Sequence, residues 1–190
     1  YEPGSRKPDV AFGDSLEGDL SRRAFTVNAI TEDIYTGRII DPLGGMRDIV
    51  RGVIRAVGNP DDRFREDPLR VLRAVRFAAQ LRFDIDRDTA AAIRRQATGL
   101  GTISAERIGA ELQSIMATEH PQRAIVTMLD LGLMSFVIPE LIEMQSTVQD
   151  ERHVHKDVFA HTMRVVSGTP PRLELRWAAL LHDVGKPATK

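Results

Sequence analysis

The sequence contains no cysteine, which excludes disulfide bonds and thiolate-ligated metal sites. It also has no apolar run near the roughly 18 to 20 residues that a membrane-spanning helix needs. Residues 1–4 carry neither the basic flank nor the apolar stretch of a signal peptide. The lack of cysteine fits a reducing compartment, and we expect a cytoplasmic protein.

An initiator methionine is missing as well. The chain opens as if within a loop and stops at Lys190, directly after the turn at 185–187, so we expect a fragment cut at both ends. With 42% hydrophobic and 28% charged residues it can still bury a sizeable core, unlike a disordered chain.

The formal net charge is only −1, so the chain lacks the overall basic field of many nucleic-acid-binding proteins. Positive charge is instead local. Residues 63–107 hold ten arginines against six acids, a net of +4, and no lysine. A solvated helical surface would explain this composition. Arginine without lysine, however, slightly favours recognition of phosphates or base edges, because a guanidinium donates two parallel hydrogen bonds.

The order of the predicted elements indicates an α+β fold. Within the first sixty residues, strand signals at 10–12, 38–40 and 52–57 are separated by turn residues. Helical periodicity follows, and Ser104 is a plausible N-cap. The predicted helices are 66–81, 88–97, 105–116, 121–131, 158–166 and 174–182, with a plausible domain boundary at 139–151.

Residues 21–30 read Ser-Arg-Arg-Ala-Phe-Thr-Val-Asn-Ala-Ile. Alone, they also fit a surface arginine pair before a core helix. The stretch resembles the ribose-contacting motif of class II nucleotidyltransferases, the family of bacterial CCA-adding enzymes and poly(A) polymerases. The resemblance implies that Arg22, Arg23 and Asn28 contact the nucleotide. The family motif has Asp where this chain has Ala24, and Ala cannot replace a carboxylate as acceptor for ribose hydroxyls, which puts sugar discrimination in question.

Residues 37–49 resemble the family's flexible connector between a catalytic head and a helical neck. Gly44 and Gly45 permit the backbone angles of a hinge, although an ordinary turn would also contain them. The resemblance implies that Asp41 couples head and neck.

Residues 65–77 resemble the family's nucleotide-selecting motif over their whole length, which implies nucleotide contacts by Asp67, Arg70, Arg73 and Arg76. Asp67 and Arg70 are three apart, so on one helix they would be neighbours. An acceptor beside a donor matches the amino group and ring nitrogen of cytosine or adenine. Uracil and guanine present the reverse order, which would cost about 1 to 3 kcal/mol for each unpaired group. An isolated Asp-x-x-Arg is far more often a helix-surface ion pair, and only the length of the match favours base selection here.

Residues 103–112 resemble the family's last neck element, which supports the nucleotide-binding helix. We expect a structural role there. Charges at a helix start and on its solvent face are common, so Glu106 and Glu111 are not predicted to be catalytic.

The last forty residues carry a second signal. His153 and His155 are expected to be ordinary core or surface residues, whereas His161, followed about twenty residues later by His182 and Asp183, resembles the metal site of HD phosphohydrolases. Neighbouring helical residues can reach one ion only over a helix end, and Gly185 ends the predicted helix there. Imidazole and carboxylate ligands leave the identity of this divalent metal open.

The resemblance as a whole implies part of a head with a mixed sheet (1–60), a helical neck and body (61–150) and the start of an HD domain (151–190). It implies transfer of CMP and AMP from CTP and ATP to the 3′ end of tRNA with release of pyrophosphate. Mg²⁺ would be held by an Asp-x-Asp pair that we expect upstream of Tyr1. Three other interpretations remain: poly(A) or A-only addition, a phosphohydrolase centred on the HD segment, and a non-catalytic RNA-binding remnant.

Overall fold

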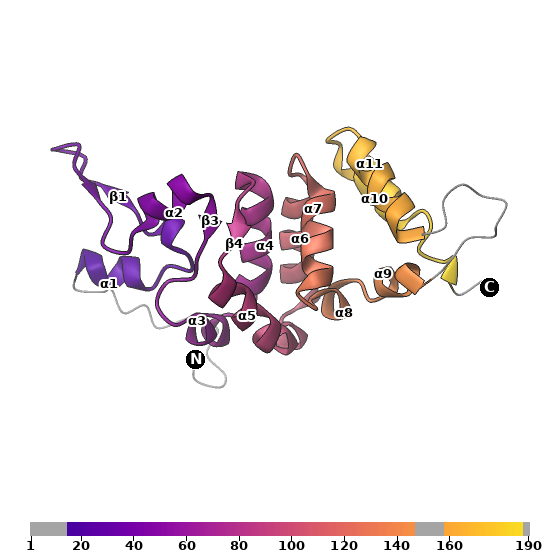
Figure 1. Cartoon of the computed structure of the whole chain (residues 1–190), viewed down its shortest axis with the longest axis horizontal. Helices are drawn as coiled ribbons and strands as arrows, with labels where there is room; N and C mark the ends of the chain where they lie inside the picture. Colours follow the sequence, from indigo (N-terminus) through magenta and orange to yellow (C-terminus); the bar gives the residue numbers. More distant parts are fainter. Residues whose placement is uncertain (1–14, 147–157, 188–190) are drawn as a thin grey trace.

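The computed structural model describes residues 15–146 and 158–187. In chain order these form α1 (Leu16–Ser21), the 3-10 helix η1 (Thr26–Asn28), β1 (Thr31–Glu32), β2 (Ile39–Ile40), α2 (Gly45–Arg51), β3 (Val53–Ile54), α3 (Pro60–Glu66), α4 (Arg70–Leu81), β4 (Asp84–Ile85), α5 (Arg87–Gln96), η2 (Ala97–Thr102), α6 (Ala105–Met116), α7 (Pro121–Asp130), α8 (Met134–Val137), α9 (Glu140–Glu143), η3 (Met144–Ser146), α10 (Val158–Gly168) and α11 (Leu173–Leu181). The molecule is elongated, with α1 and β1 at one end, α4, α6 and α7 in the middle, and α10 and α11 at the other (Figure 1). The predicted α+β class is confirmed.

The described strands form two short pairs. β1 lies antiparallel to β2, with Thr31 opposite Ile40, and β3 lies parallel to β4, with Val53 opposite Asp84. The predicted strands at 38–40 and 52–57 are present in shortened form, whereas 10–12 lies outside the described residues. The parallel pair holds the first part of the chain against the segment that follows α4.

Five of the six predicted helices begin and end within two residues of their predicted limits. Ser104 caps α6, because its Oγ accepts the main-chain N–H of Arg107. Helices α5, α7, α10 and α11 lie within two residues of their predicted limits. Helix α2 (Gly45–Arg51) was not predicted. Gly44 has φ +75°, and the chain enters α2 immediately after it.

The helix predicted over 66–81 is wrong in its first turn. Helix α3 ends at Glu66, and α4 begins only at Arg70. Asp67 lies between them in extended conformation, with φ −145° and ψ 96°. The cause is Pro68, since the ring of a proline disfavours helical backbone in the preceding residue.

The main hydrophobic cluster of the described residues runs from Phe25 near η1 through Leu72 to Leu180 in α11, and a second, small cluster contains Leu20, Ala29 and Val57. Helix α4 packs on α6 and α7, and α10 packs on α7 and α11. None of the described helices is both long and apolar enough to cross a membrane.

Candidate functional site

Asp67 contacts residues of two helices, Arg73 of α4 and Arg107 of α6. Its Oδ1 accepts from Nη2 of Arg107 at 3.1 Å and from the main-chain N–H of Leu69 at 3.3 Å. Its Oδ2 is 3.6 Å from Nη1 of Arg73. The side chain is 23% exposed, so a ligand can reach it.

Arg70 follows Asp67 at the start of α4, but the two do not share a helical face as predicted, because Asp67 precedes the helix. Nη1 of Arg70 donates to Glu66 at 2.8 Å and to the main-chain carbonyl of Arg63 at 3.0 Å. In the described part of the chain, all side-chain hydrogen bonds of Arg70 come from this one nitrogen. The rest of the guanidinium can donate to a ligand.

Arg73 and Arg76 converge on one carboxylate of α6. Nε of Arg73 donates to Oε1 of Glu111 at 3.1 Å, and Nε of Arg76 lies 3.1 Å from Oε2 of the same residue. The second contact lacks hydrogen-bond geometry and is an ion pair. Glu111 is buried, so the expectation that it lies on a solvent face is wrong.

The three residues within 21–30 that were predicted to contact the nucleotide lie on the surface. Arg22 follows α1, Arg23 pairs with Asp19 at 2.9 Å, and Asn28 ends η1. Arg63 of α3 joins this segment to the next, since its Nη1 donates to the main-chain carbonyl of Ser21 at 3.2 Å and its Nη2 to Glu66 at 2.6 Å. Glu66 forms ion pairs with both Arg63 and Arg70. The two predicted nucleotide-contacting segments therefore lie next to each other.

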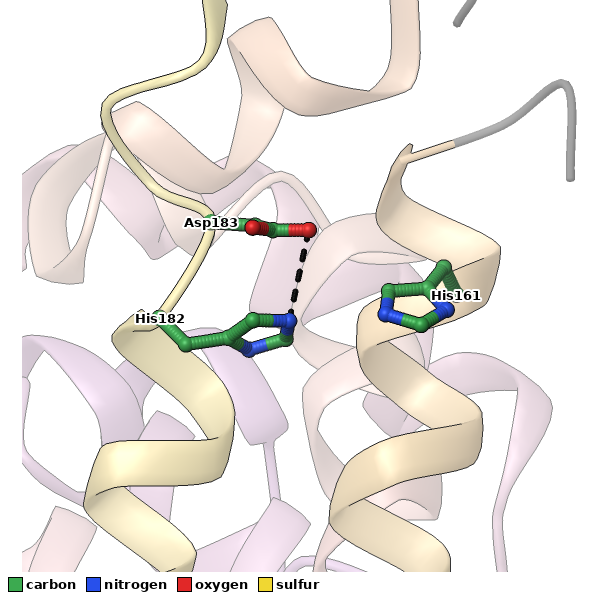
Figure 2. A group of neighbouring side chains, drawn as sticks. All are labelled: His161, His182 and Asp183. Carbon is green, nitrogen blue, oxygen red and sulfur yellow. Dashed lines mark ion pairs between the residues drawn. The ribbon is translucent and has the colours of Figure 1, made fainter. Parts of the chain in front are cut away.

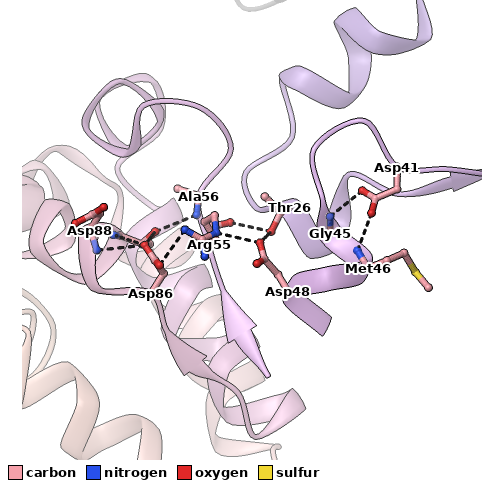
Figure 3. Close-up of polar contacts among 10 residues, drawn as sticks. Thr26, Asp41, Gly45, Met46, Asp48, Arg55, Ala56, Asp86 and Asp88 are labelled. Carbon is pink, nitrogen blue, oxygen red and sulfur yellow. Dashed lines mark hydrogen bonds and ion pairs between the residues drawn. The ribbon is translucent and has the colours of Figure 1, made fainter. Parts of the chain in front are cut away.

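Asp41 caps α2. Its two oxygens accept the main-chain N–H groups of Gly45 at 2.7 Å and Met46 at 2.9 Å, as Figure 3 shows. Gly45 is packed tightly, because a Cβ there would overlap the main-chain oxygen of Thr26. Its small size is thus needed for close approach, and the structure assigns it no hinge conformation.

Figure 3 also shows a polar chain between α2 and α5. The Oγ1 of Thr26 donates to fully buried Asp48 at 2.7 Å, and Nε of Arg55 donates to the same carboxylate at 3.1 Å. Nη1 of Arg55 reaches Asp86 at 3.0 Å, and Asp86 caps α5. The neighbouring Asp48 carboxylate raises the pKa of Arg55.

Asp84 and Asp86 have Asp-x-Asp spacing but do not form a metal site. Asp84 forms an ion pair with Arg123 at 2.7 Å. Asp86 forms an ion pair with Arg55 and accepts hydrogen bonds from main-chain N–H groups at the start of α5. The one group of three or more metal-ligating side chains among the described residues is elsewhere, at the end of α11.

That cluster contains the three predicted residues His161, His182 and Asp183. Their potential ligand atoms lie within 4.8 Å of one another, with His161 on α10 and the other two at the end of α11 (Figure 2). Nδ1 of His182 is 2.9 Å from the main-chain oxygen of Ala179, and this contact favours the tautomer with a proton on Nδ1. Its Nε2 then carries the lone pair and lies 3.3 Å from Oδ2 of Asp183. The donor set fits a divalent transition metal. His153 and His155 lie outside the described residues.

Sequence reasoning missed Arg107, Glu111 and Asp48 as parts of these sites. The contacts Thr26–Asp48, Arg73–Glu111 and Asp67–Arg107 span 22, 38 and 40 residues of sequence, so no local spacing marks them. The buried Glu111 on α6 is the clearest case.

Comparison with known families gives two matches. Residues 1–55 match the poly(A) polymerase head domain, and residues 82–144 match the probable RNA and SrmB-binding site of polymerase A. The A-adding tRNA nucleotidyltransferase of Deinococcus radiodurans is 42% identical over 191 aligned positions, which cover 95% of this chain and 43% of that protein. The chain belongs to the family of CCA-adding enzymes and poly(A) polymerases.

Other members support this assignment. The CCA-adding enzyme of Geobacillus thermodenitrificans is 39% identical over 97% of the chain and 43% of its own length. The crystal structure of the Bacillus stearothermophilus CCA-adding enzyme in complex with CTP has a TM-score of 0.74 at 36% identity, covering 92% of this chain and 41% of that one. The chain thus spans under half the length of these family members.

Proposed function

We propose that this chain carries the base-selecting part of an enzyme that adds CMP and AMP to the 3′ end of tRNA without a template, using CTP and ATP. The observation that carries the proposal is that Asp67 directly precedes α4 and Arg70 is the first residue of that helix, each with hydrogen-bonding capacity left for a ligand. The family members named above as CCA-adding enzymes support it.

Base selection follows from hydrogen-bond chemistry. Oδ2 of Asp67 would accept from the amino group of cytosine or adenine, and the remaining N–H groups of Arg70 would donate to the adjacent ring nitrogen. Uracil and guanine present a carbonyl oxygen and a ring N–H in the same places. Like groups would then face each other without solvent, which disfavours these bases.

Arg22, Arg23 and Asn28 would contact the sugar and phosphates, because the Ser21–Arg63–Glu66 contacts bring their segment beside Arg70. Arg73 and Arg76 would extend the positive surface towards the nucleotide or the tRNA end. Asp41 would couple head and neck by fixing the start of α2. The head (1–60), neck and body (61–150) and HD segment (151–190) are proposed as functional units in a cytoplasmic enzyme.

Two metal requirements belong to the proposal. Mg²⁺ held by a carboxylate pair would supply charge stabilisation for in-line attack of the RNA 3′-hydroxyl on the α-phosphate. His161, His182 and Asp183 would separately hold a divalent ion that polarises water for hydrolysis of phosphate ends. This chain's own contribution to that second site is to fix the tautomer of His182 through the carbonyl of Ala179.

A-only addition is the second candidate, favoured by the A-adding relative from Deinococcus radiodurans. Asp67 and Arg70 fit cytosine and adenine alike, so their geometry suits both activities. The two differ in a direct assay: a tRNA ending before CCA accepts CMP from a CCA-adding enzyme, whereas an A-adding enzyme extends only tRNA that already ends in CC.

The test is nucleotide choice in the natural protein, measured as kcat/KM for CTP, ATP, UTP and GTP. Asp67→Ala and Arg70→Ala should raise UTP and GTP use relative to CTP and ATP by about tenfold or more, the value of one mispaired buried group. Arg95→Ala is the matched control, since Arg95 also pairs with an aspartate, Asp61, and neither residue contacts Asp67 or Arg70 among the described hydrogen bonds and ion pairs. Unchanged ratios in both site variants would contradict the base-selecting role, and an absence of any transfer by the unmodified protein would favour a non-catalytic RNA-binding role.

A further inference from the structure

The two oxygens of Asp67 have unequal surroundings. Oδ1 has two partners within hydrogen-bond distance, Nη2 of Arg107 at 3.1 Å and the N–H of Leu69 at 3.3 Å. Among the described residues, the contact given for Oδ2 is the 3.6 Å ion pair with Arg73. A carboxylate has about four acceptor positions. Oδ2 is therefore the oxygen with capacity left for a new donor.

Arg107 belongs to a different helix, α6, and hydrogen bonds fix the position of its main chain. It lies in the first turn of α6, where its main-chain N–H is 3.5 Å from Oγ and 3.1 Å from the main-chain oxygen of Ser104. One turn further, Glu111 projects from the same side of α6 to Arg73 and Arg76. One face of α6 thus contacts both Asp67 and the arginines of α4.

The other partner of Asp67 is already committed. Arg73 donates from Nε to buried Glu111 at 3.1 Å, and its Nη1 stays at 3.6 Å from Oδ2 of Asp67, outside hydrogen-bond distance. Arg107 has no second carboxylate among the described residues, and its side chain is 50% exposed. The orientation of the Asp67 carboxylate therefore depends on Arg107 and on the N–H of Leu69.

We propose that Arg107 is a positioning residue for base selection: it holds Oδ1 of Asp67 so that Oδ2 points towards the amino group of the incoming base. This inference rests on the proposed base-selecting role of Asp67. Without Arg107 the carboxylate can rotate about its last bond, and the acceptor is no longer fixed where cytosine and adenine carry their amino group. The loss falls on discrimination between bases, because triphosphate contacts do not involve Asp67.

A merely structural role predicts a different outcome. An ion pair with a half-exposed arginine contributes little to stability. Its removal would then lower the melting temperature slightly and leave the ranking of nucleotides unchanged. Nucleotide ranking and melting temperature together separate the two roles.

The experiment compares Arg107→Ala, Arg107→Lys and the control Arg95→Ala in the natural protein, with kcat/KM for CTP, ATP, UTP and GTP and the melting temperature for each. We expect Arg107→Ala to raise the UTP-to-CTP ratio about tenfold, the effect of one lost charge-assisted hydrogen bond. Arg107→Lys should restore part of the discrimination, because lysine keeps the charge but not the planar fork. Arg95→Ala should keep the original ratio.

Failure of this inference is distinguishable from failure of the proposed function. If Asp67→Ala relaxes nucleotide choice but Arg107→Ala does not, Arg107 has no positioning role and the base-selecting site stands. If neither variant changes the ratios, Asp67 does not select bases and both ideas are overturned. If Arg107→Ala changes the ratios only together with a large drop in melting temperature that Arg107→Lys shares, the effect is structural and the positioning role is rejected.

Discussion

Arg176 of α11 donates a hydrogen bond of 2.6 Å to the main-chain carbonyl oxygen of Met116, the last residue of α6. The same nitrogen also donates to the carbonyl of Thr118. Arg176 is only 4% exposed, although arginine is rarely buried without partners. A positive charge at the C-terminal end of a helix is favourable, so this contact ties α11 to the element that supports Asp67.

Replacement of Arg176 should therefore destabilise the whole chain. Arg176→Met keeps much of the side-chain volume but leaves two carbonyls without their donor, at an expected cost of about 2 to 4 kcal/mol. Arg172→Ala, an exposed arginine at the start of the same helix, should change stability by less than about 0.5 kcal/mol. Urea unfolding of both variants checks this, and equal losses would show that the buried contact is unimportant.

Gly45 and Gly109 offer a matched pair of glycine substitutions. Gly45→Ala should destabilise by about 1 to 3 kcal/mol, because its Cβ would overlap the main-chain oxygen of Thr26 and the side chain of Ile30. Gly109→Ala in α6 meets nothing within 4 Å and should stabilise by about 0.5 to 1 kcal/mol. Thermal unfolding measures both. A neutral Gly45→Ala would argue against the close packing of α2 on η1.

Asp61 should make stability depend on pH in the acid range. Hydrogen bonds from Arg95 and Gln96 lower the pKa of Asp61 from 3.8 to about 2. The folded state thus prefers the ionised form, and this contribution is fully present above about pH 4 and disappears as the pH falls through 2. The stability difference between the natural chain and Asp61→Asn should follow this course. Asp62→Asn is the control, because Asp62 and its partner Arg65 are both more than half exposed; an equal pH course in both variants would contradict the assignment.

The metal cluster can be tested without an activity assay. We expect Mn²⁺ to bind the chain weakly, with His182→Ala weakening binding at least about tenfold and His120→Ala, outside the cluster, leaving it unchanged. Calorimetry or the paramagnetic broadening of histidine signals by Mn²⁺ reports this. Identical affinity in His182→Ala would mean that the residue only ends α11 in a structural domain.

Position 24 tests the sugar contact implied by residues 21–30. In the natural protein, Ala24→Asp should increase the preference for ribonucleotides over deoxyribonucleotides, because a carboxylate accepts from the 2′-hydroxyl. The kcat/KM ratio for ATP and dATP measures this. Ala24 is only partly buried, so the larger side chain has a route to solvent. A constant ratio would place the ribose elsewhere.

The sequence predicted much of this architecture, and its failures have identifiable causes. Ser104 was correctly predicted as an N-cap because capping depends on a local contact three residues away. The shared helix of Asp67 and Arg70 was wrong because hydrophobic periodicity was given more weight than the backbone restriction before Pro68.

Non-local contacts were harder to predict. β4 is two residues long and pairs with β3, with Val53 opposite Asp84, so it carries almost no pattern of its own. Glu111 was expected on a solvent face because its partners, Arg73 and Arg76, lie on another helix. His161, His182 and Asp183 were brought together as predicted, since metal-ligating residue types are informative even when far apart.

The hydrophobic cluster that extends from Phe25 to Leu180 has a consequence for cooperativity. Because α4, α6, α7 and α11 share buried side chains, loss of one helix would expose apolar surface on the next. The described residues should then unfold in one transition, with equal calorimetric and van't Hoff enthalpies. Local opening around Arg70 and Arg73 of α4 would be opposed by the packing of helices at the far end of the molecule.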